Sequence, residues 1–129
     1  MIPSQIAKFV EKMSSRYTCV LATSSGDVPN AVPIGYVKVV NDALVLADFY
    51  FTKTKANIEA NPRVAVSCWD VETFEGYQLK GRAFIDTGPY FKLIEGEFKD
   101  KPFKPRSAVV VLAEEVYSLK PGDYGRKLL

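Results

Sequence analysis

The chain has no histidine and only two cysteines among its 129 residues. Without histidine, most zinc sites, His-based catalytic triads and His-ligated haem are excluded. The two cysteines, Cys19 and Cys68, lie far apart within strand-like runs and show no CxxC spacing. We therefore expect two reduced thiols in the core of a cytoplasmic protein.

The chain also has little net charge and no long apolar run. Its 17 Lys and Arg residues against 15 Asp and Glu residues give a net charge of +2. Such a balance argues against nucleic acid or a membrane surface as the main partner. No apolar run is long enough to span a bilayer, and the N-terminus has no signal-peptide pattern. With 47% apolar and 25% charged residues, we expect one soluble globular domain over residues 1–129.

Apolar alternation and turn signals predict six strands. Residues 77–88 show the clearest alternation, in which one face carries apolar or small side chains and the other carries mostly polar ones. Ser24–Asp27 and Asn41–Asp42 are turn signals. The predicted strands comprise residues 17–23, 28–40, 43–47, 63–69, 77–88 and 105–119.

Three short helices are predicted around these strands. Residues 2–13 place apolar side chains on one helical face, and Pro3-Ser4 suits a helix start. A second helix covers residues 54–60, before Asn61-Pro62, and a third starts at Gly88-Pro89. The expected fold is mainly β with peripheral helices, a six-stranded antiparallel barrel that is closed or nearly closed. A β-sandwich is the alternative.

The stretch "ADFYFTKTK" joins a strand to the second helix, so it lies at the positive end of that helix. Free amides there attract a phosphate, to which Thr52 and Thr54 could add hydroxyl donors and Lys53 a positive charge. Asp48 opposes an anion unless its carboxylate points away. The alternative is that one threonine is an ordinary N-cap and the lysines are solvated.

The order of these motifs resembles the pyridoxamine 5′-phosphate oxidase-like family of FMN-binding split barrels, especially its small FMN-binding proteins. The resemblance is carried by "LATSSGDVPNAVPIGYVKV", "LVLADFYFTKTKANIEANPRVAVSCW" and "YQLKGRAFI", over roughly residues 17–88. It implies a six-stranded split β-barrel, FMN as cofactor and a homodimer with FMN in clefts at the interface. It favours the phosphate site over simple capping.

The resemblance also assigns cofactor-binding residues by position. Lys53 corresponds to the family's basic phosphate ligand, and Gln78 lies near the contact made from the dimer partner. Residues 32–34 correspond to the strand along the flavin; Pro33 equally fits an edge strand or a bulge. The full set is Val32, Pro33, Ile34, Ala47, Asp48, Thr52, Lys53, Thr54 and Gln78.

The implied function is that of a flavoprotein oxidoreductase, related to flavin reductases, that exchanges hydride or electrons with a small-molecule donor or acceptor. Full oxidases carry a longer C-terminal segment with Arg, His and Trp residues for the substrate, whereas this chain ends "SLKPGDYGRKLL", with no histidine and its only tryptophan at Trp69. We therefore do not expect pyridoxamine 5′-phosphate oxidation itself. The alternative is a non-enzymatic electron carrier or FMN store. The third possibility is a barrel that has lost its cofactor and serves as a binding module.

The roles of two other segments are left open by the sequence. Phe49–Phe51 could pack in the core or lie beside a flavin ring. The basic loop Lys99–Arg106 is more typical of a solvated connector than of a ligand site. The glutamates at 95, 97, 114 and 115 fit solvated faces better than a catalytic pair.

Overall fold

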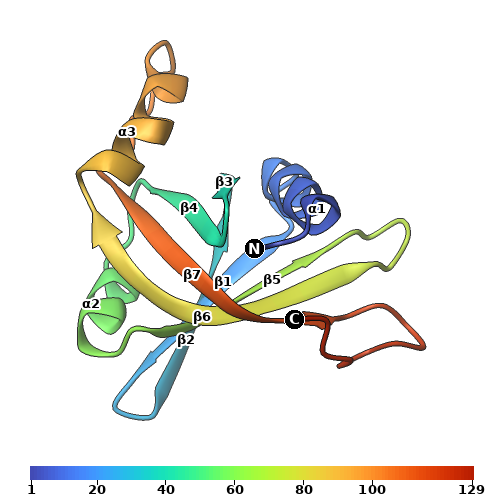
Figure 1. Cartoon of the computed structure of the whole chain (residues 1–129). Coiled ribbons are helices and arrows are strands. Elements are labelled where there is room, and N and C mark those ends of the chain that lie inside the picture. The colour runs from blue at the N-terminus through green and yellow to red at the C-terminus, as the bar shows by residue number, and fades with distance from the viewer.

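The computed structural model describes residues 1–129 and contains one antiparallel sheet of seven strands in the order β2-β1-β5-β6-β7-β4-β3. The sheet curls strongly and does not close (Figure 1). Its strands are β1 (Cys19–Ser25), β2 (Val28–Ile34), β3 (Val37–Val40), β4 (Ala43–Asp48), β5 (Arg63–Trp69), β6 (Gly76–Asp86) and β7 (Ser107–Ser118). The prediction of a mainly β, barrel-like fold with peripheral helices is confirmed, and the single sheet excludes the sandwich.

The predicted number of six strands is wrong by one. Residues 28–40 form two strands, separated by a break at Gly35–Tyr36. Before the break, β2 pairs with β1; after it, β3 pairs with β4 at the opposite edge of the sheet. The break arises because the chain must leave one edge of the curled sheet and join the other.

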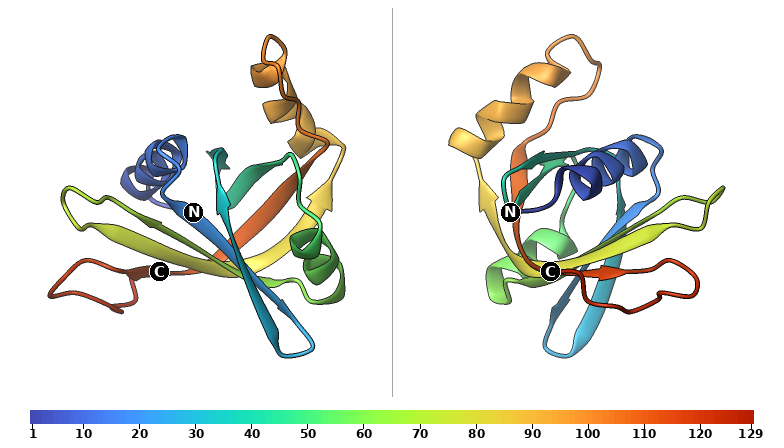
Figure 2. Two further views of the ribbon diagram at one scale, coloured as in Figure 1. Left: turned by 180° about the vertical axis from the view of Figure 1, so that it is seen from behind. Right: turned by 45° about the vertical axis from the view of Figure 1, so that its right-hand side comes forward.

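The concave face of the sheet encloses the main core, which α1 (Ser4–Ser15) covers at one end (Figure 2). Ile6, Val10 and Met13 of α1 are buried there, as their spacing predicts. Strand β4 is buried on both faces. Its outward side chains, including Val45, pack against α3 (Pro89–Glu95) and the 3₁₀ turn η1 (Gly96–Phe98) in a second, smaller core.

Helix boundaries follow the local signals. α2 (Lys53–Ala60) ends before Asn61-Pro62, as predicted, and buries Ile58. It packs against β1, β2 and β6. α3 begins at Pro89, and the carboxylate of Asp86 accepts hydrogen bonds from three amides at its start, those of Gly88, Tyr90 and Phe91.

The expectation of two reduced thiols is wrong. Cys19 and Cys68 are directly opposed in the β1–β5 ladder, with Cα atoms 4.2 Å apart, and form a disulfide. Their pairing depends on strand register, which spacing along the chain does not reveal. The thiols therefore no longer argue for a cytoplasmic location. None of the helices combines the length and apolar character that crossing a membrane requires.

Candidate functional site

An apolar pocket of about 600 Å³ lies where β2 and β4 end. Ten of its twelve lining residues are hydrophobic, and none is charged. We call it the aromatic pocket. It is lined by Tyr17, Val32–Tyr36, Ala47, Phe49–Phe51, Phe98 and Phe103. Four of the predicted site residues are therefore brought together, namely Val32, Pro33, Ile34 and Ala47.

One wall of the aromatic pocket consists of rings packed edge to face. The Phe49 ring lies 5.2 Å from that of Phe98 and 5.5 Å from that of Phe103, and the Tyr36 ring lies 5.1 Å from that of Phe98. Such pairs hold one another in fixed orientations. Phe49 and Phe51 pack against the two cores and also line the pocket, whereas Tyr50 lines the pocket and is 82% exposed. Core packing is thus confirmed for two of the three aromatic residues.

Strand β2 also lines the pocket and is an edge strand. It pairs only with β1, where Pro33 is opposite Val20. A proline is tolerated here because an edge strand leaves part of its hydrogen-bonding potential unused. The edge-strand interpretation of Pro33 and its predicted place beside a ligand are therefore compatible.

The entrance to α2 leaves backbone donors free. Thr52 occupies the N-cap position, but its hydroxyl donates to the carbonyl of Tyr50 and caps no helical amide. The amides of Lys53, Thr54 and Lys55 donate to no acceptor in the chain. The side chain of Lys53 is exposed and forms no ion pair. Ordinary side-chain capping therefore does not explain this sequence, and the helix end can accept an anion.

Thr54 is buried and takes part in docking the helix. Its hydroxyl accepts a hydrogen bond of 3.1 Å from the Asn30 amide of β2. Asn57, one turn further along α2, donates to Thr23 of β1 at 3.0 Å. These contacts fix α2 on the sheet. Asn30 and Asn57 were not among the predicted site residues, although Asn57 belongs to the motif that carries the family resemblance.

Asp48 is completely buried and is not among the residues that line the aromatic pocket. It accepts hydrogen bonds from the Phe51 amide at 2.8 Å and the Ser107 hydroxyl at 2.7 Å, and pairs with Arg106 at 3.3 Å. Arg106 also donates to the Phe51 carbonyl. This network fixes the turn between β4 and α2, and Arg106 balances the charge of the Asp48 carboxylate.

The basic loop Lys99–Arg106 has a structural role at two of its residues. Besides Arg106, Lys104 donates from its ammonium group to the carbonyls of Phe98, Lys99 and Lys101. These bonds satisfy carbonyls at the end of η1. The loop thereby holds Phe98 and Phe103 in the wall of the aromatic pocket.

Gln78 lies apart from the other predicted residues. It is in β6, opposite Ser67 and Tyr117, and does not line the aromatic pocket. On neighbouring strand β7, the Tyr117 hydroxyl donates to Glu115 at 2.6 Å. This bond lowers the pKa of Glu115 and raises that of Tyr117. A single chain therefore does not bring Gln78 to the pocket.

Comparison with known proteins agrees with the fold and the motifs. The family model described as pyridoxamine 5′-phosphate oxidase matches residues 2–120, so the chain belongs to this family of split-barrel proteins and the resemblance is confirmed. The chain is 32% identical over 128 residues to Uncharacterized protein MJ0282 of Methanocaldococcus jannaschii, covering 95% of this chain and 85% of that protein.

Solved structures share the fold at lower identity. HupZ of Group A Streptococcus superposes with a TM-score of 0.81 at 20% identity, over 97% of this chain and 99% of the other. An FMN-binding protein from Syntrophomonas wolfei gives a TM-score of 0.74 at 14% identity, over 90% and 87% of the two chains.

Proposed function

We propose that this protein binds FMN and acts as an oxidoreductase. The observation that carries the proposal is the continuity of the aromatic pocket with the free amides of α2, through the Phe49–Thr52 segment. A flavin has the same two parts, a planar ring system and a phosphate. The uncharged pocket fits the ring, and the helix end with Lys53 fits the phosphate. Family membership supports the same assignment.

Each predicted residue then has a role in the proposed site. Val32, Pro33, Ile34 and Ala47 would contact the flavin ring and ribityl chain. Thr52 and Lys53 would bind the phosphate together with the amide of Thr54. Asp48 is proposed as a positioning residue, because its carboxylate fixes the turn and Asp48 does not line the pocket. Gln78 would contact the flavin bound to the partner subunit.

Bound FMN would supply hydride or electron transfer, and the chain would bind and orient it. No carboxylate, lysine, arginine or histidine lines the aromatic pocket. The absence of these groups favours a second candidate, a non-enzymatic electron carrier or flavin store, since tyrosine hydroxyls are the only side-chain groups of the pocket that could transfer a proton. The proposed location is the cytoplasm, where reduced nicotinamides are available as electron donors.

The first prediction concerns the cofactor. Freshly purified protein, or protein to which FMN is added before the excess is removed, is expected to retain a two-band flavin absorption spectrum. Chromatography of the released cofactor would distinguish FMN from FAD and riboflavin. A colourless protein that does not retain FMN would contradict the proposal. Turnover of NADH or NADPH with an acceptor would then distinguish an enzyme from a carrier.

The second prediction is a homodimer with flavin at its interface. Gln78 lies on the face of the sheet that carries exposed Lys80 and Arg82, away from the aromatic pocket of its own chain. It can contact flavin only from a second copy. Light scattering is expected to give twice the mass of one 14.4 kDa chain. A monomer mass across working concentrations would contradict the shared site.

A further inference from the structure

The hairpin that joins β5 to β6 projects from the body of the protein, on the side away from α3 (Figure 1, Figure 2). We call its residues 69–76 the arm. Val71 and Phe74 at its tip are 65% and 67% exposed, and Trp69 at its start is exposed as well. Three large apolar side chains in the open on one projecting hairpin are typical of an interaction surface.

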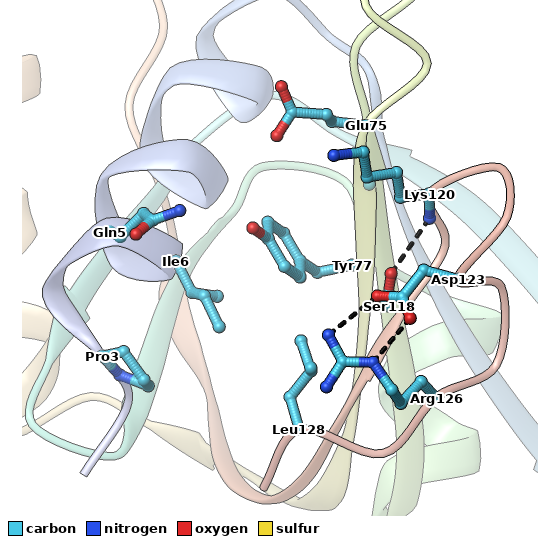
Figure 3. A pocket seen from close by; sticks show the side chains of 11 residues that line it. Pro3, Gln5, Ile6, Glu75, Tyr77, Ser118, Lys120, Asp123, Arg126 and Leu128 are labelled. Atoms are coloured by element: carbon cyan, nitrogen blue, oxygen red, sulfur yellow. Dashed lines mark hydrogen bonds and ion pairs between the residues drawn. The ribbon is translucent and has the colours of Figure 1, made fainter.

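The arm has a fixed conformation. Across its tip, the Asp70 amide donates to the Glu75 carbonyl and the Phe74 amide donates to the Asp70 carbonyl, both at 2.9 Å. Phe74 has a φ of 61°, which a bulky residue rarely adopts unless its surroundings impose it. At the base, the Tyr77 ring projects toward α1 (Figure 3) and lies 5.1 Å from the Phe9 ring, edge to face. The arm is thus held on its inner side, whereas the apolar side chains at its tip are exposed.

Strand register indicates where the arm of a second copy would lie. This step rests on the proposed function, in which Gln78 contacts the flavin of the partner. Gln78 and Pro33 are the two ends of one row, Pro33–Val20–Ser67–Gln78, which crosses β2, β1, β5 and β6. The row is on the outer face of the sheet, because the neighbours of these residues along each strand pack in the main core.

Two outer faces that pack together exchange the ends of this row about a two-fold axis that runs along the strands, between β1 and β5. Such an axis places Gln78 of one copy over Pro33 of the other. Two residues beyond Pro33 is Gly35, which lines the aromatic pocket, and two residues before Gln78 is Gly76, at the base of the arm. Both steps leave the row in the same direction, so this axis lays the arm of one copy across the aromatic pocket of the other.

The arm and the border of the aromatic pocket carry opposite charge. Residues 70–75 contain three carboxylates and no Lys or Arg, whereas the loop Lys99–Arg106 contains four Lys and Arg residues and one Asp. Glu72 of the arm and Lys99 and Lys101 of the loop are exposed and form no ion pair within the chain. Such complementarity favours the arm of a second copy as the partner of the loop.

We propose that the arm of each copy closes the aromatic pocket of the other, with Phe74 packed against Tyr50 and Phe103. Both of these lining residues are exposed in a single chain, so the arm would cover them. Each site then contains an aromatic side chain from the partner, and the two-fold axis makes the contact occur twice. The closed site would exclude water from a bound flavin.

Cross-linking tests the contact between copies. Both native cysteines are buried in a disulfide, so introduced cysteines are the reactive ones. The double variant Phe74→Cys/Phe103→Cys, treated with a short bismaleimide, is expected to give a covalent dimer on a denaturing gel, and neither single variant should. Phe74→Cys/Val28→Cys is the matched control, because Val28 is exposed at the far end of β2. Equal yields from the two double variants would overturn the proposal.

A substitution at the tip tests closure of the site. Phe74→Asn removes the ring but keeps the backbone conformation, because asparagine tolerates a positive φ. We expect FMN affinity to fall about three- to tenfold, the effect of losing an aromatic contact, and iodide to quench the bound flavin more strongly. Tyr124→Asn, which removes an exposed ring outside the arm and the pocket, should change neither.

The outcomes distinguish the arm from the proposed function. A dimer that retains FMN but gives no covalent product, or whose FMN affinity is the same with and without the Phe74 ring, would overturn the role of the arm alone. A monomer, or a protein that does not retain FMN, would overturn the shared flavin site and the role of the arm with it.

Discussion

Replacing Asp48 with alanine is expected to lower the free energy of unfolding by about 3 kcal/mol. The carboxylate is completely buried and is held by the Phe51 amide, the Ser107 hydroxyl and Arg106. Its removal leaves the buried Ser107 hydroxyl and the Phe51 amide without an acceptor. Arg106 lessens the effect, because its side chain is 52% exposed and can be solvated. The loss therefore falls at the lower end of the range for breaking a buried pair.

Urea denaturation of the protein without added flavin measures this loss directly. Asp100→Ala is the matched control, because Asp100 is exposed and its side chain has no partner. It is expected to change stability by no more than about 0.5 kcal/mol. Equal stabilities of the Asp48 and Asp100 variants would mean that the buried network does not stabilise the fold.

The same substitution separates positioning from direct contact at the proposed flavin site. Asp48 contacts the turn that carries Phe51 into the aromatic pocket and leads to the α2 amides. Loss of its bonds should loosen that turn and weaken flavin binding together with stability. A residue that only contacted the cofactor would weaken binding and leave the stability of the flavin-free protein unchanged.

Local patterns predicted most of the fold. Alternation located the strands, and apolar spacing with Pro3 and Pro89 located two helices. The failures concern pairing between distant segments. The break at Gly35–Tyr36 follows from the two edges that β2 and β3 join, and the disulfide follows from the β1–β5 register. Neither pairing leaves a signal in the spacing along the chain.

In the candidate site, too, local motifs predicted the short segments, whereas contacts between distant segments were missed. Val32–Ile34, Ala47 and the α2 entrance follow from motifs contained in short stretches. Val32–Ile34 and Ala47 line the aromatic pocket together, whereas residues 52–54 do not line it. Arg106 and Ser107 were missed because they are 58 and 59 residues from Asp48 and reach it only through the pairing of β4 with β7. The motif places Asp48 correctly at the end of its strand, but only the structure reveals which way its carboxylate points.

Replacing Lys53 with alanine is expected to weaken FMN binding by about 10- to 100-fold, the effect of losing one charge-assisted phosphate contact. Lys53 is exposed and makes no ion pair, so the fold and the stability of the flavin-free protein should not change. Fluorescence titration with FMN measures the affinity. Riboflavin, which lacks the phosphate, should bind the variant and the unaltered protein equally.

Lys8→Ala is the control for Lys53→Ala, because Lys8 is likewise exposed in a helix but lies in α1. It should leave FMN affinity unchanged. If Lys53→Ala binds FMN as tightly as the control, Lys53 is not a phosphate ligand. If both variants lose affinity equally, the effect comes from overall charge and not from the α2 entrance. Weaker FMN binding by the Lys53 variant alone, with riboflavin unaffected, would assign the phosphate to the positive end of α2.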